Sequence, residues 1–545
     1  MATSTAFPYL TVLVLVPAIG AVLVAVIPRH AVAAWFHEAL GVAVTVVTLC
    51  VAAVVAFKFK AGYGGFQLVS DHMWAKDLGI HWSLGIDGIS LFLVLLTAVL
   101  FPLTILGARA RRDPRSFVGW LLLLEAACMG SFVSLDLVLF FLFFELTLVP
   151  AYFLIGGWGY ARRGYAAIKF FVYTFAGSAF LLVGILAVAF IHQSQTGVLT
   201  FELPALMHTH FSGSEGVLLF LAFTAAFAVK APIFPFHTWS PDAYAEAPTA
   251  GSILMVAVMA KLGTYGIIRF DLNLFPQASR TLAPLLLTLA VIGIVYGALV
   301  ACAQRDLKRL LAYSSLAQIG FIALGTFALN SQGLSGGVLQ MVNHGLVIAT
   351  LFILVGWIYE RRATWQVTSL KGLQSPAPVL AGIFTVAMMA SIGVPGLNGF
   401  VGEFLILIGT FVAHRWWAVV ATGGVIVAAV YLLWGYQQVF HGEPTAEDAK
   451  TRDLSWNERL IVAPLIILIV LLGVFPKPLL DRITPSVNQL VVHVDQVTNT
   501  KVPAGLEPRP VATAAPRHDP SLAIAAPRPP ADPGSRTAGP TGGTP

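Results

Sequence analysis

The sequence predicts an all-α polytopic membrane protein with about fourteen transmembrane helices. It also predicts two inverted five-helix repeats, each with a broken helix. Of the 545 residues, 57% are hydrophobic and only 11% are charged, a composition that soluble domains of this length do not show. Apolar runs of spanning length recur along the chain, and two of them are interrupted by proline or glycine beside an ionisable residue.

The apolar runs are each long enough to cross a hydrocarbon core of about 30 Å. They lie at residues 8–28, 32–57, 86–108, 115–134, 136–159, 166–192, 217–240, 248–270, 282–303, 309–330, 335–359, 376–413, 416–440 and 458–479. Residues 1–30 have no basic segment ahead of the first run, so we expect a retained first helix rather than a cleaved signal.

The runs divide the chain into five predicted segments. These are residues 1–110, transmembrane helices 1–3 with an external loop at 59–85; residues 111–275, the first repeat (helices 4–8); residues 276–442, the inverted second repeat (helices 9–13); residues 443–482, the final transmembrane helix; and residues 483–545, a disordered tail. The tail is rich in proline and alanine, a composition that cannot bury a core. Because each repeat has five spans, an odd number, the second must be inverted.

Basic residues gather in four short loops between the predicted spans. The positive-inside rule makes these loops cytoplasmic, which places both termini on the outer side of the cell's inner (plasma) membrane. The formal net charge of +6 therefore reflects topology, and we expect the lipid bilayer rather than nucleic acid as a partner. The basic residues are Arg109, Arg111, Arg112, Arg115, Arg162, Arg163, Arg305, Lys308, Arg309, Arg361, Arg362 and Lys371.

The chain offers little for holding a redox cofactor or a metal. Cys50, Cys128 and Cys302 lie far apart in apolar runs, which argues against iron–sulfur, zinc and disulfide chemistry. The glycines at 393–402 have the wrong spacing for a nucleotide loop and follow no predicted strand. We therefore expect no cofactor in this chain.

Two predicted helices are broken beside an ionisable residue. Pro232 and Pro235 follow Lys230 and remove backbone donors, and the glycines and proline of residues 393–399 precede Glu403. Lys230 and Glu403 lie at corresponding places in the two predicted repeats. A pair of interrupted helices in matching positions is the sequence signature of a transporter built from inverted repeats, with its site at the breaks.

Glu145 lies near the middle of the fifth predicted span. A lone carboxylate or a lone ammonium inside a membrane favours its neutral form, but Glu145 and Lys230 together could keep each other charged. A change in their separation would then bind or release a proton. The alternative is a static ion pair that holds two helices together.

Lys261 lies within ILMVAVMAKLG, and the eighth predicted span has no acid one turn away. An ionisable group at this depth costs roughly 2.5–3.5 kcal/mol, which makes it a candidate functional residue. The alternative is that its ammonium extends to the membrane surface, but Lys261 is more than about two helical turns from either end of the span.

The remaining candidates each have a structural alternative. Glu403 could instead cap the half-helix that begins near it. His237, in the first break, and His344, inside VLQMVNHGLVIATLFIL, could pass protons or be hydrogen-bonded core histidines. Glu125, within LLLLEAACMG, could face a partner protein or serve a local structural role.

Four stretches give the chain a resemblance to a known family. They are FFELTLVPAYFLIGGWG (143–159), VKAPIFPFHTWSPDAYAEAPTAGS (229–252), RDLKRLLAYSSLAQIGF (305–321) and GLNGFVGEFLILIG (396–409). They resemble the antiporter-type membrane subunits of respiratory complex I, from the first span to about residue 480. The glutamate at 403, where the L and N types usually carry lysine, makes the chain most similar to the M type of NADH-quinone oxidoreductase.

The resemblance implies a proton channel. In it Glu145 and Lys230 form the gating pair, Lys261 is the central relay and Glu403 is the exit towards the outside. His237 and His344 bridge through ordered water, and Glu125 links laterally to a neighbouring subunit. Gln318 and Tyr244 stand where M subunits often carry histidine, which argues against titration at those two positions.

The resemblance also implies partners. L-type and N-type antiporter-like subunits are expected as neighbours, and NADH, FMN, iron–sulfur clusters and quinone are expected in other subunits of the complex, where quinone reduction would drive this chain. An Mrp-type cation/proton antiporter subunit and the membrane subunit of an energy-converting hydrogenase are alternatives on the same scaffold. A purely structural scaffold is a third, and the unpartnered Lys261 argues against it.

Overall fold

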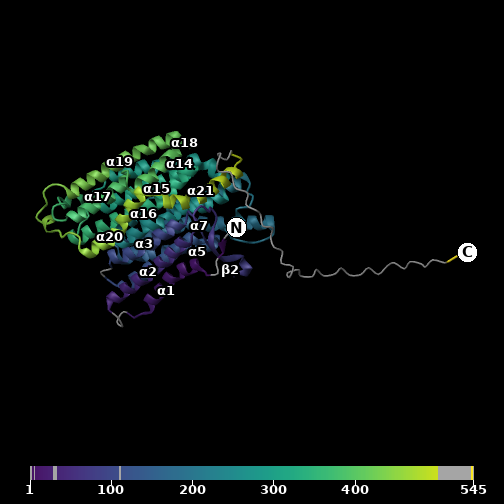
Figure 1. The fold of residues 1–545 in the computed structure, drawn as a ribbon, viewed down its shortest axis with the longest axis horizontal. Coiled ribbons are helices and arrows are strands. Elements are labelled where there is room, and N and C mark those ends of the chain that lie inside the picture. Colours follow the sequence, from purple (N-terminus) through teal and green to yellow (C-terminus); the bar gives the residue numbers. More distant parts are fainter. Residues whose placement is uncertain (1–2, 5–6, 29–32, 110–111, 501–541, 544–545) are drawn as a thin grey trace. The chain divides into compact units, whose positions relative to one another are not determined.

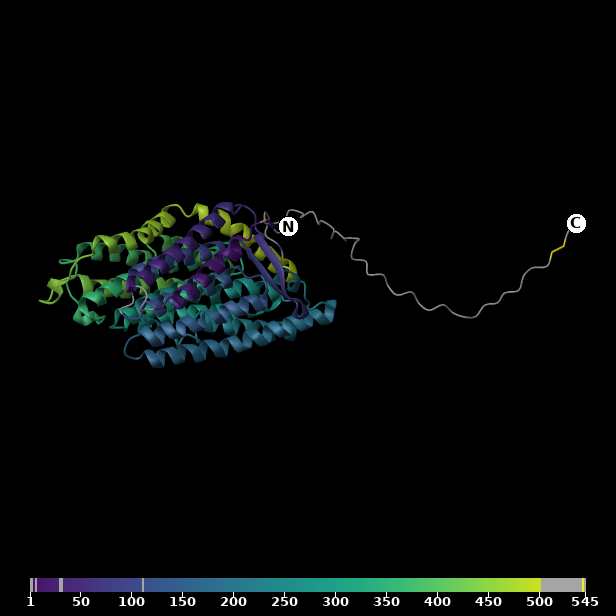
Figure 2. The same cartoon turned by 90° about the horizontal axis from the view of Figure 1, so that it is seen from below.

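The computed structural model describes residues 3–4, 7–28, 33–109, 112–500 and 542–543. The chain divides into two units, residues 1–506 and 507–545. All helices and strands of the described residues lie in the first unit. Within that unit the long helices run side by side as a bundle (Figures 1 and 2).

The helices and strands have the following bounds. The α-helices are α1 (Tyr9–Val26), α2 (Ala34–Lys58), α3 (Leu91–Gly107), α4 (Pro114–Val133), α5 (Leu137–Leu146), α6 (Leu148–Trp158), α7 (Arg163–Thr196), α8 (Leu203–Leu206), α9 (Gly213–Lys230), α10 (Ser240–Glu246), α11 (Thr249–Leu254), α12 (Ala260–Gly266), α13 (Leu272–Leu274), α14 (Pro276–Cys302), α15 (Leu307–Phe327), α16 (Ser331–Arg362), α17 (Pro378–Ile392), α18 (Asn398–Ala413), α19 (Arg415–Phe440), α20 (Trp456–Val474) and α21 (Lys477–Val497). Two π-helical segments, η2 (Met255–Met259) and η3 (Ile267–Asp271), connect α11, α12 and α13. Short 3₁₀ turns are η1 (Lys76–Leu78), η4 (Val367–Ser369) and η5 (Asp448–Lys450), and the strands are β1 (Thr3–Ser4), β2 (Gln67–Ala75) and β3 (Ile80–Ile86).

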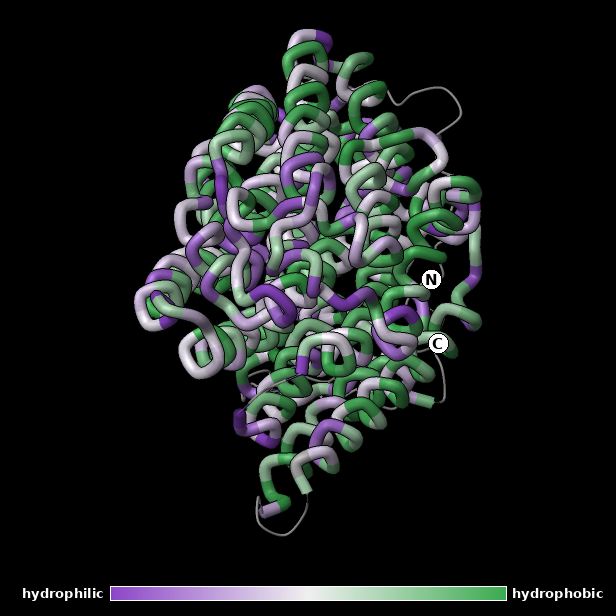
Figure 3. Tube along the Cα trace, turned by 90° about the vertical axis from the view of Figure 1, so that its left-hand side faces the viewer, coloured by the Kyte–Doolittle hydropathy of each residue, from purple (hydrophilic) through white to green (hydrophobic). Residues whose placement is uncertain are grey.

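Membrane-spanning character extends through most of the bundle. Among the described residues, 12 helices are long and apolar enough to cross a membrane when α5–α6 and the run from α11 to α13 are each taken as one. The shorter apolar helices α3, α17 and α18 fall on the predicted spans at 86–108 and 376–413. Figure 3 shows hydrophobic stretches along most of these helices. The predicted all-α membrane fold is confirmed, while the fourteen spans and the inverted repeats stay predictions.

Both predicted breaks are present. Helix α9 ends at Lys230, and α10 begins only at Ser240. Helix α17 ends at Ile392, and the next residue, Gly393, has a left-handed φ of +82°, a conformation that glycine adopts without a steric cost. Helix α18 then begins at Asn398.

A third break, which was not predicted, divides the fifth span at Thr147. The run 136–159 forms two helices, α5 and α6, which meet at this residue. Pro150 lies three residues further along and has no backbone N–H to donate to the carbonyl of Leu146. The break therefore has a local cause in the sequence.

The predicted external loop at 59–85 contains an antiparallel hairpin. Strands β2 and β3 pair with Asp71 opposite Ser83 and Met73 opposite His81. The Leu135 N–H donates to the Ser83 carbonyl at 2.8 Å, which attaches the hairpin to the segment between α4 and α5. The hairpin is thus a fixed part of the bundle.

The prediction of disorder from residue 483 is wrong as far as residue 500. Helix α21 covers Lys477–Val497, and its buried residues recur at helical spacing, as in Ile483, Val487 and Leu490. The Gly88 N–H donates to Ser486 Oγ at 2.9 Å, so this amphipathic helix packs on the bundle. Residues 501–541 and 544–545, the rest of the predicted tail, lie outside the described residues.

Candidate functional site

Lys230 ends α9 and is only 2% exposed. Its ammonium donates to Thr147 Oγ1 at 2.7 Å and towards the Phe144 carbonyl at 3.4 Å. It also lies 4.6 Å from the centre of the Phe144 ring, a cation–π contact that substitutes for part of its hydration. The break between α5 and α6 therefore supplies the partners of this buried cation.

Glu145 lies on α5 beside these contacts but does not form an ion pair with Lys230. Among the described residues no salt bridge joins them, and the hydrogen bonds of the Lys230 ammonium go to Thr147 and the Phe144 carbonyl. The Ser178 hydroxyl on the neighbouring α7 donates to the Thr174 carbonyl at 2.9 Å, and Glu145 Oε1 has no partner in the described part of the chain. Glu145 and Lys230 therefore do not form a static ion pair in this structure.

Lys261 is completely buried, with 0% exposure, between the π-helical segments η2 and η3. Its ammonium lies 2.7 Å from the Val256 carbonyl and 2.7 Å from His344 Nδ1 on α16. π-Helical turns often occur at functional sites, and here the carbonyl that Lys261 contacts belongs to such a turn. The alternative in which Lys261 extends to the membrane surface is excluded by this burial.

The contact with Lys261 links the tautomer of His344 to the charge of the lysine. When Lys261 is an ammonium it can only donate, so Nδ1 accepts and a neutral imidazole carries its proton on Nε2. His344 Nε2 has no partner among the described residues. In that charge state the ring accepts from Lys261 on one side and presents an N–H on the other. The contact with Lys261 is direct, whereas the resemblance implied a link through ordered water.

Glu403 is 5% exposed and lies on α18. Gln318 Nε2 of α15 donates to Glu403 Oε1 at 2.8 Å, and Gln340 Nε2 of α16 donates to Gln318 Oε1 at 2.8 Å. Glu403 lies in the second turn of α18, and in the described structure no backbone N–H donates to it. Glu403 therefore does not cap the N-terminus of α18.

Helix α16 carries the residues that approach both Lys261 and Glu403. Gln340 and His344 are four residues apart, so they share one helix face. Gln340 donates to Gln318, which in turn contacts Glu403, and His344 contacts Lys261. Asn343 Nδ2 on the same helix donates to the Asn398 carbonyl at the start of α18. Sequence reasoning missed Gln340 and Asn343, although two amides beside a histidine in an apolar run were a usable signal.

Two of the predicted site residues lie apart from these contacts. His237 is buried in the first break, where its ring packs against Phe234 and Tyr296 at 5.5 and 5.0 Å between centres. Glu125 is 0% exposed on α4, and neither carboxylate oxygen has a partner in the described residues. Its burial contradicts direct contact with a neighbouring subunit, because the side chain faces the interior of this chain.

Other buried charges were not singled out from the sequence. Arg269 Nη2 donates to Asp87 Oδ1 at 2.6 Å, with both side chains buried. Lys308, assigned to a cytoplasmic loop by its position between spans, is also buried. It donates to the carbonyls of Ala245 and Ala247 at 3.0 and 2.7 Å.

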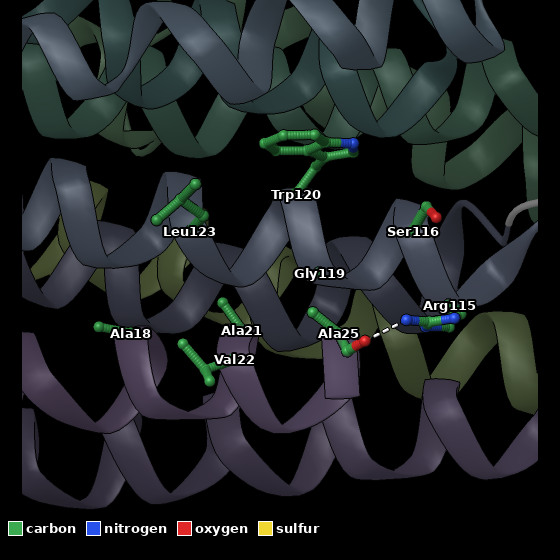
Figure 4. A pocket seen from close by; sticks show the side chains of 9 residues that line it. All are labelled: Ala18, Ala21, Val22, Ala25, Arg115, Ser116, Gly119, Trp120 and Leu123. Carbon is green, nitrogen blue, oxygen red and sulfur yellow. Dashed lines mark hydrogen bonds between the residues drawn. The ribbon is translucent and has the colours of Figure 1, made fainter. Parts of the chain in front are cut away.

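The surface and cavities offer two further features. Asp71, His81 and Glu202 lie close enough together to hold a metal ion. A pocket of about 300 Å³ lies between α1 and α4 (Figure 4), with mostly apolar lining and Arg115 at one end. None of the seven predicted site residues lines it.

Comparisons with known proteins agree with the resemblance. A family model described as NADH:quinone oxidoreductase/Mrp antiporter, transmembrane, matches residues 134–428. NADH-quinone oxidoreductase subunit M of Rhodobacter capsulatus is 43% identical over 510 residues, which cover 91% of this chain and 99% of that protein. The same subunit from Mycobacterium tuberculosis (strain ATCC 25618 / H37Rv) is 40% identical over 531 residues, which cover 90% of this chain and 95% of the relative.

Solved structures give the same picture. A chain of respiratory complex I from Thermus thermophilus with bound NADH matches with a TM-score of 0.81 and 30% identity, covering 89% of this chain and 99% of that one. A chain of the Mrp complex from Dietzia sp. DQ12-45-1b has a TM-score of 0.78 at 21% identity, covering 90% and 100%, and so shares the fold. By sequence and by structure, the chain belongs to the family of antiporter-like M subunits of NADH-quinone oxidoreductase.

Proposed function

We propose that this chain is a proton-translocating membrane subunit of respiratory complex I, with its path running from Lys230 through Lys261 and His344 to Glu403. The observation that carries the proposal is the contact of 2.7 Å between Lys261 and His344, in which a buried ammonium donates to an imidazole whose other nitrogen is uncommitted. Such a ring can take a proton at Nδ1 and give one from Nε2.

The entrance of the path is the group formed by Lys230, Thr147 and Glu145. Lys230 now donates to the Thr147 hydroxyl, while Glu145 Oε1 is unpartnered in the described residues. A small movement that transfers the ammonium from Thr147 to Glu145 would favour the protonated lysine, since the ion pair stabilises both charges. The reverse movement releases the proton inward, which makes the pair a gate.

At the other end, Glu403 is held by two amides in series. Gln318 donates to the carboxylate, and Gln340 fixes the orientation of Gln318. An amide does not titrate, so these residues position the Glu403 carboxylate rather than pass the proton themselves. Water between His344 and Glu403 would complete the path.

The rest of the complex supplies the driving reaction. In this proposal NADH, FMN, iron–sulfur clusters and quinone bind to other subunits, and quinone reduction acts on this chain through L-type and N-type neighbours. The arginine-rich loops face the cytoplasm, and both termini lie on the outer side of the plasma membrane. Glu125, which is fully buried, would communicate with a neighbour only indirectly, and His237 would lie beside the path near its first break.

The test is NADH-driven acidification of inverted membrane vesicles. Lys261→Met and His344→Asn remove the donor and the acceptor of the central contact, and each should lower the rate of acidification by about tenfold or more. His192→Asn is the matched control, because His192 is also buried but bonds Thr209 at 2.8 Å, away from the path. Undiminished acidification in both path variants, with normal assembly, refutes the proposal.

A further inference from the structure

The hairpin of β2 and β3 brings three potential metal ligands together. In the described part of the chain, Asp71, His81 and Glu202 form the one group of three whose ligand atoms all lie within 4.8 Å of each other. His81 Nδ1 is 2.9 Å from Asp71 Oδ1 and 3.9 Å from Glu202 Oε1. The three residues come from β2, from β3 and from the segment that leads into α8.

The register of the hairpin explains why two of them meet. Met73 pairs with His81 and Asp71 with Ser83, so Asp71 and His81 are diagonal neighbours on one face of the ladder, within reach of long side chains. A hydrogen bond to the segment before α5 holds the backbone of His81 in place, because its N–H donates to Asp136 Oδ2 at 3.0 Å. An isolated bridge between Asp136 and Glu202 holds the third residue beside the other two.

The electrostatics of this group favour a cation. Asp71, Glu202 and Asp136 place three carboxylates around one imidazole, and no lysine or arginine among the described residues forms an ion pair with any of them. A neutral His81 leaves the group strongly negative, and a protonated His81 compensates only one of the three charges. A divalent ion would neutralise two charges at once and use the imidazole as a ligand.

We propose that Asp71, His81 and Glu202 form a binding site for a divalent transition-metal cation of the zinc type, at the face opposite the arginine-rich loops. One imidazole nitrogen and two carboxylate oxygens are the ligands that zinc accepts at bond lengths of about 2.0–2.2 Å. A tetrahedral site places such ligand atoms about 3.3 Å apart, so the distances of 2.9 and 3.9 Å need only small side-chain movements. The imidazole disfavours calcium and magnesium, which prefer oxygen ligands.

The site is open to the aqueous phase. The Asp71 side chain is 45% exposed, and those of His81 and Glu202 are partly exposed. A metal can therefore enter without unfolding the hairpin, and water can take the fourth position. Once bound, it would connect both strands to the segment before α8, beside Asp136, whose carboxylate caps α5 by accepting from the Leu139 N–H.

The experiment uses the full chain in detergent, metal-free after chelation and checked for folding by circular dichroism. Co²⁺ is the probe, because tetrahedral Co²⁺ with a nitrogen ligand gives visible d–d absorption and occupies zinc sites. The unmodified chain should bind one Co²⁺ with this absorption and lose it on addition of Zn²⁺. His81→Gln and Glu202→Gln should each weaken binding by about 100-fold.

His72→Gln is the matched control. His72 lies on the same hairpin, next to Asp71 in sequence, but is exposed on the other face of the strand, so its loss should leave Co²⁺ affinity unchanged. If the unmodified chain gives no Co²⁺ absorption, the site does not exist. If His81→Gln and His72→Gln bind Co²⁺ equally, the metal is held elsewhere and the proposal is overturned.

Discussion

The second broken helix permits a sharp test of how Glu403 is positioned, because two glycines there differ in a single respect. Gly393 and Gly396 both have positive φ, +82° and +94°. A Cβ added at Gly393 would overlap Glu403 Oε2, whereas one added at Gly396 would meet nothing within 4 Å. Gly393→Ala therefore combines backbone strain with displacement of the carboxylate, and Gly396→Ala has the strain alone.

The expected magnitudes follow from these contacts. A left-handed conformation costs an alanine about 1–2 kcal/mol, which applies to both variants. In Gly393→Ala the overlap with Oε2 also forces the carboxylate to shift. We expect this shift to break the bond from Gln318 to Oε1, a hydrogen bond to a charged group worth about 1.5–3 kcal/mol. Gly393→Ala should thus destabilise the chain by about 2.5–5 kcal/mol, and Gly396→Ala by about 1–2 kcal/mol.

Two measurements separate position from stability. The apparent melting temperature of the solubilised complex reports the difference in stability, and NADH-driven acidification of inverted vesicles reports proton transfer. A carboxylate displaced by about 1 Å should slow transfer by about 10- to 100-fold in Gly393→Ala, with near-normal transfer in Gly396→Ala. If the two variants pump equally and melt together, Glu403 is not held as described.

Three further changes test other contacts. Thr147→Val removes the hydroxyl that binds Lys230 at 2.7 Å and should lower both stability, by about 1.5–3 kcal/mol, and vesicle acidification. Asp87→Asn leaves the buried Arg269 charge uncompensated and should destabilise the chain by about 3–5 kcal/mol, read as a lower melting temperature that Arg269→Met partly restores in the double variant. Ile483→Ala opens a gap under α21 and should cost about 2–5 kcal/mol, measured by thermal unfolding and by proteolysis near the end of that helix.

Each of these changes has a conservative counterpart. Thr147→Ser keeps the hydroxyl and should preserve pumping, and Asp87→Glu keeps the charge. Val497→Ala, at an exposed position on α21, should change the melting temperature little. If Thr147→Val and Thr147→Ser pump equally, or if Asp87→Asn is as stable as the unmodified chain, the corresponding contact has no energetic role.

The predicted site residues were found because an ionisable side chain in an apolar run is conspicuous in a single sequence. Lys261 and Glu403 needed no partner to be noticed. Their partners could not be found in this way, because His344 is 83 residues from Lys261 and Gln318 is 85 residues from Glu403. The family resemblance makes Gln318 a departure from the usual histidine, whereas in the structure its amide donates to the Glu403 carboxylate.

The errors in the fold prediction have physical causes as well. Composition assigns the region of helix α21 to the proline-rich tail, because an average hides the helical period of buried residues such as Ile483 and Val487. The apolar run 136–159 predicts one continuous span, because Pro150 does not interrupt its hydrophobicity, and the break at Thr147 is therefore not predicted. The sequence predicts only a loop where the hairpin lies, since polar and aromatic residues at 67–86 alternate too irregularly to identify both strands.

The π-helical segments on either side of Lys261 have a consequence for the register of this helix. A π-turn contains one residue more than an α-turn, so η2 takes up one residue more than a regular α-helix would within the same rotation. Each residue of an α-helix advances the side-chain direction by about 100°. If Met255–Met259 wound as regular α-helix with every residue kept, Lys261 would instead rotate by about 100° away from His344. The additional residue that the π-turn takes up therefore determines the direction in which the lysine points.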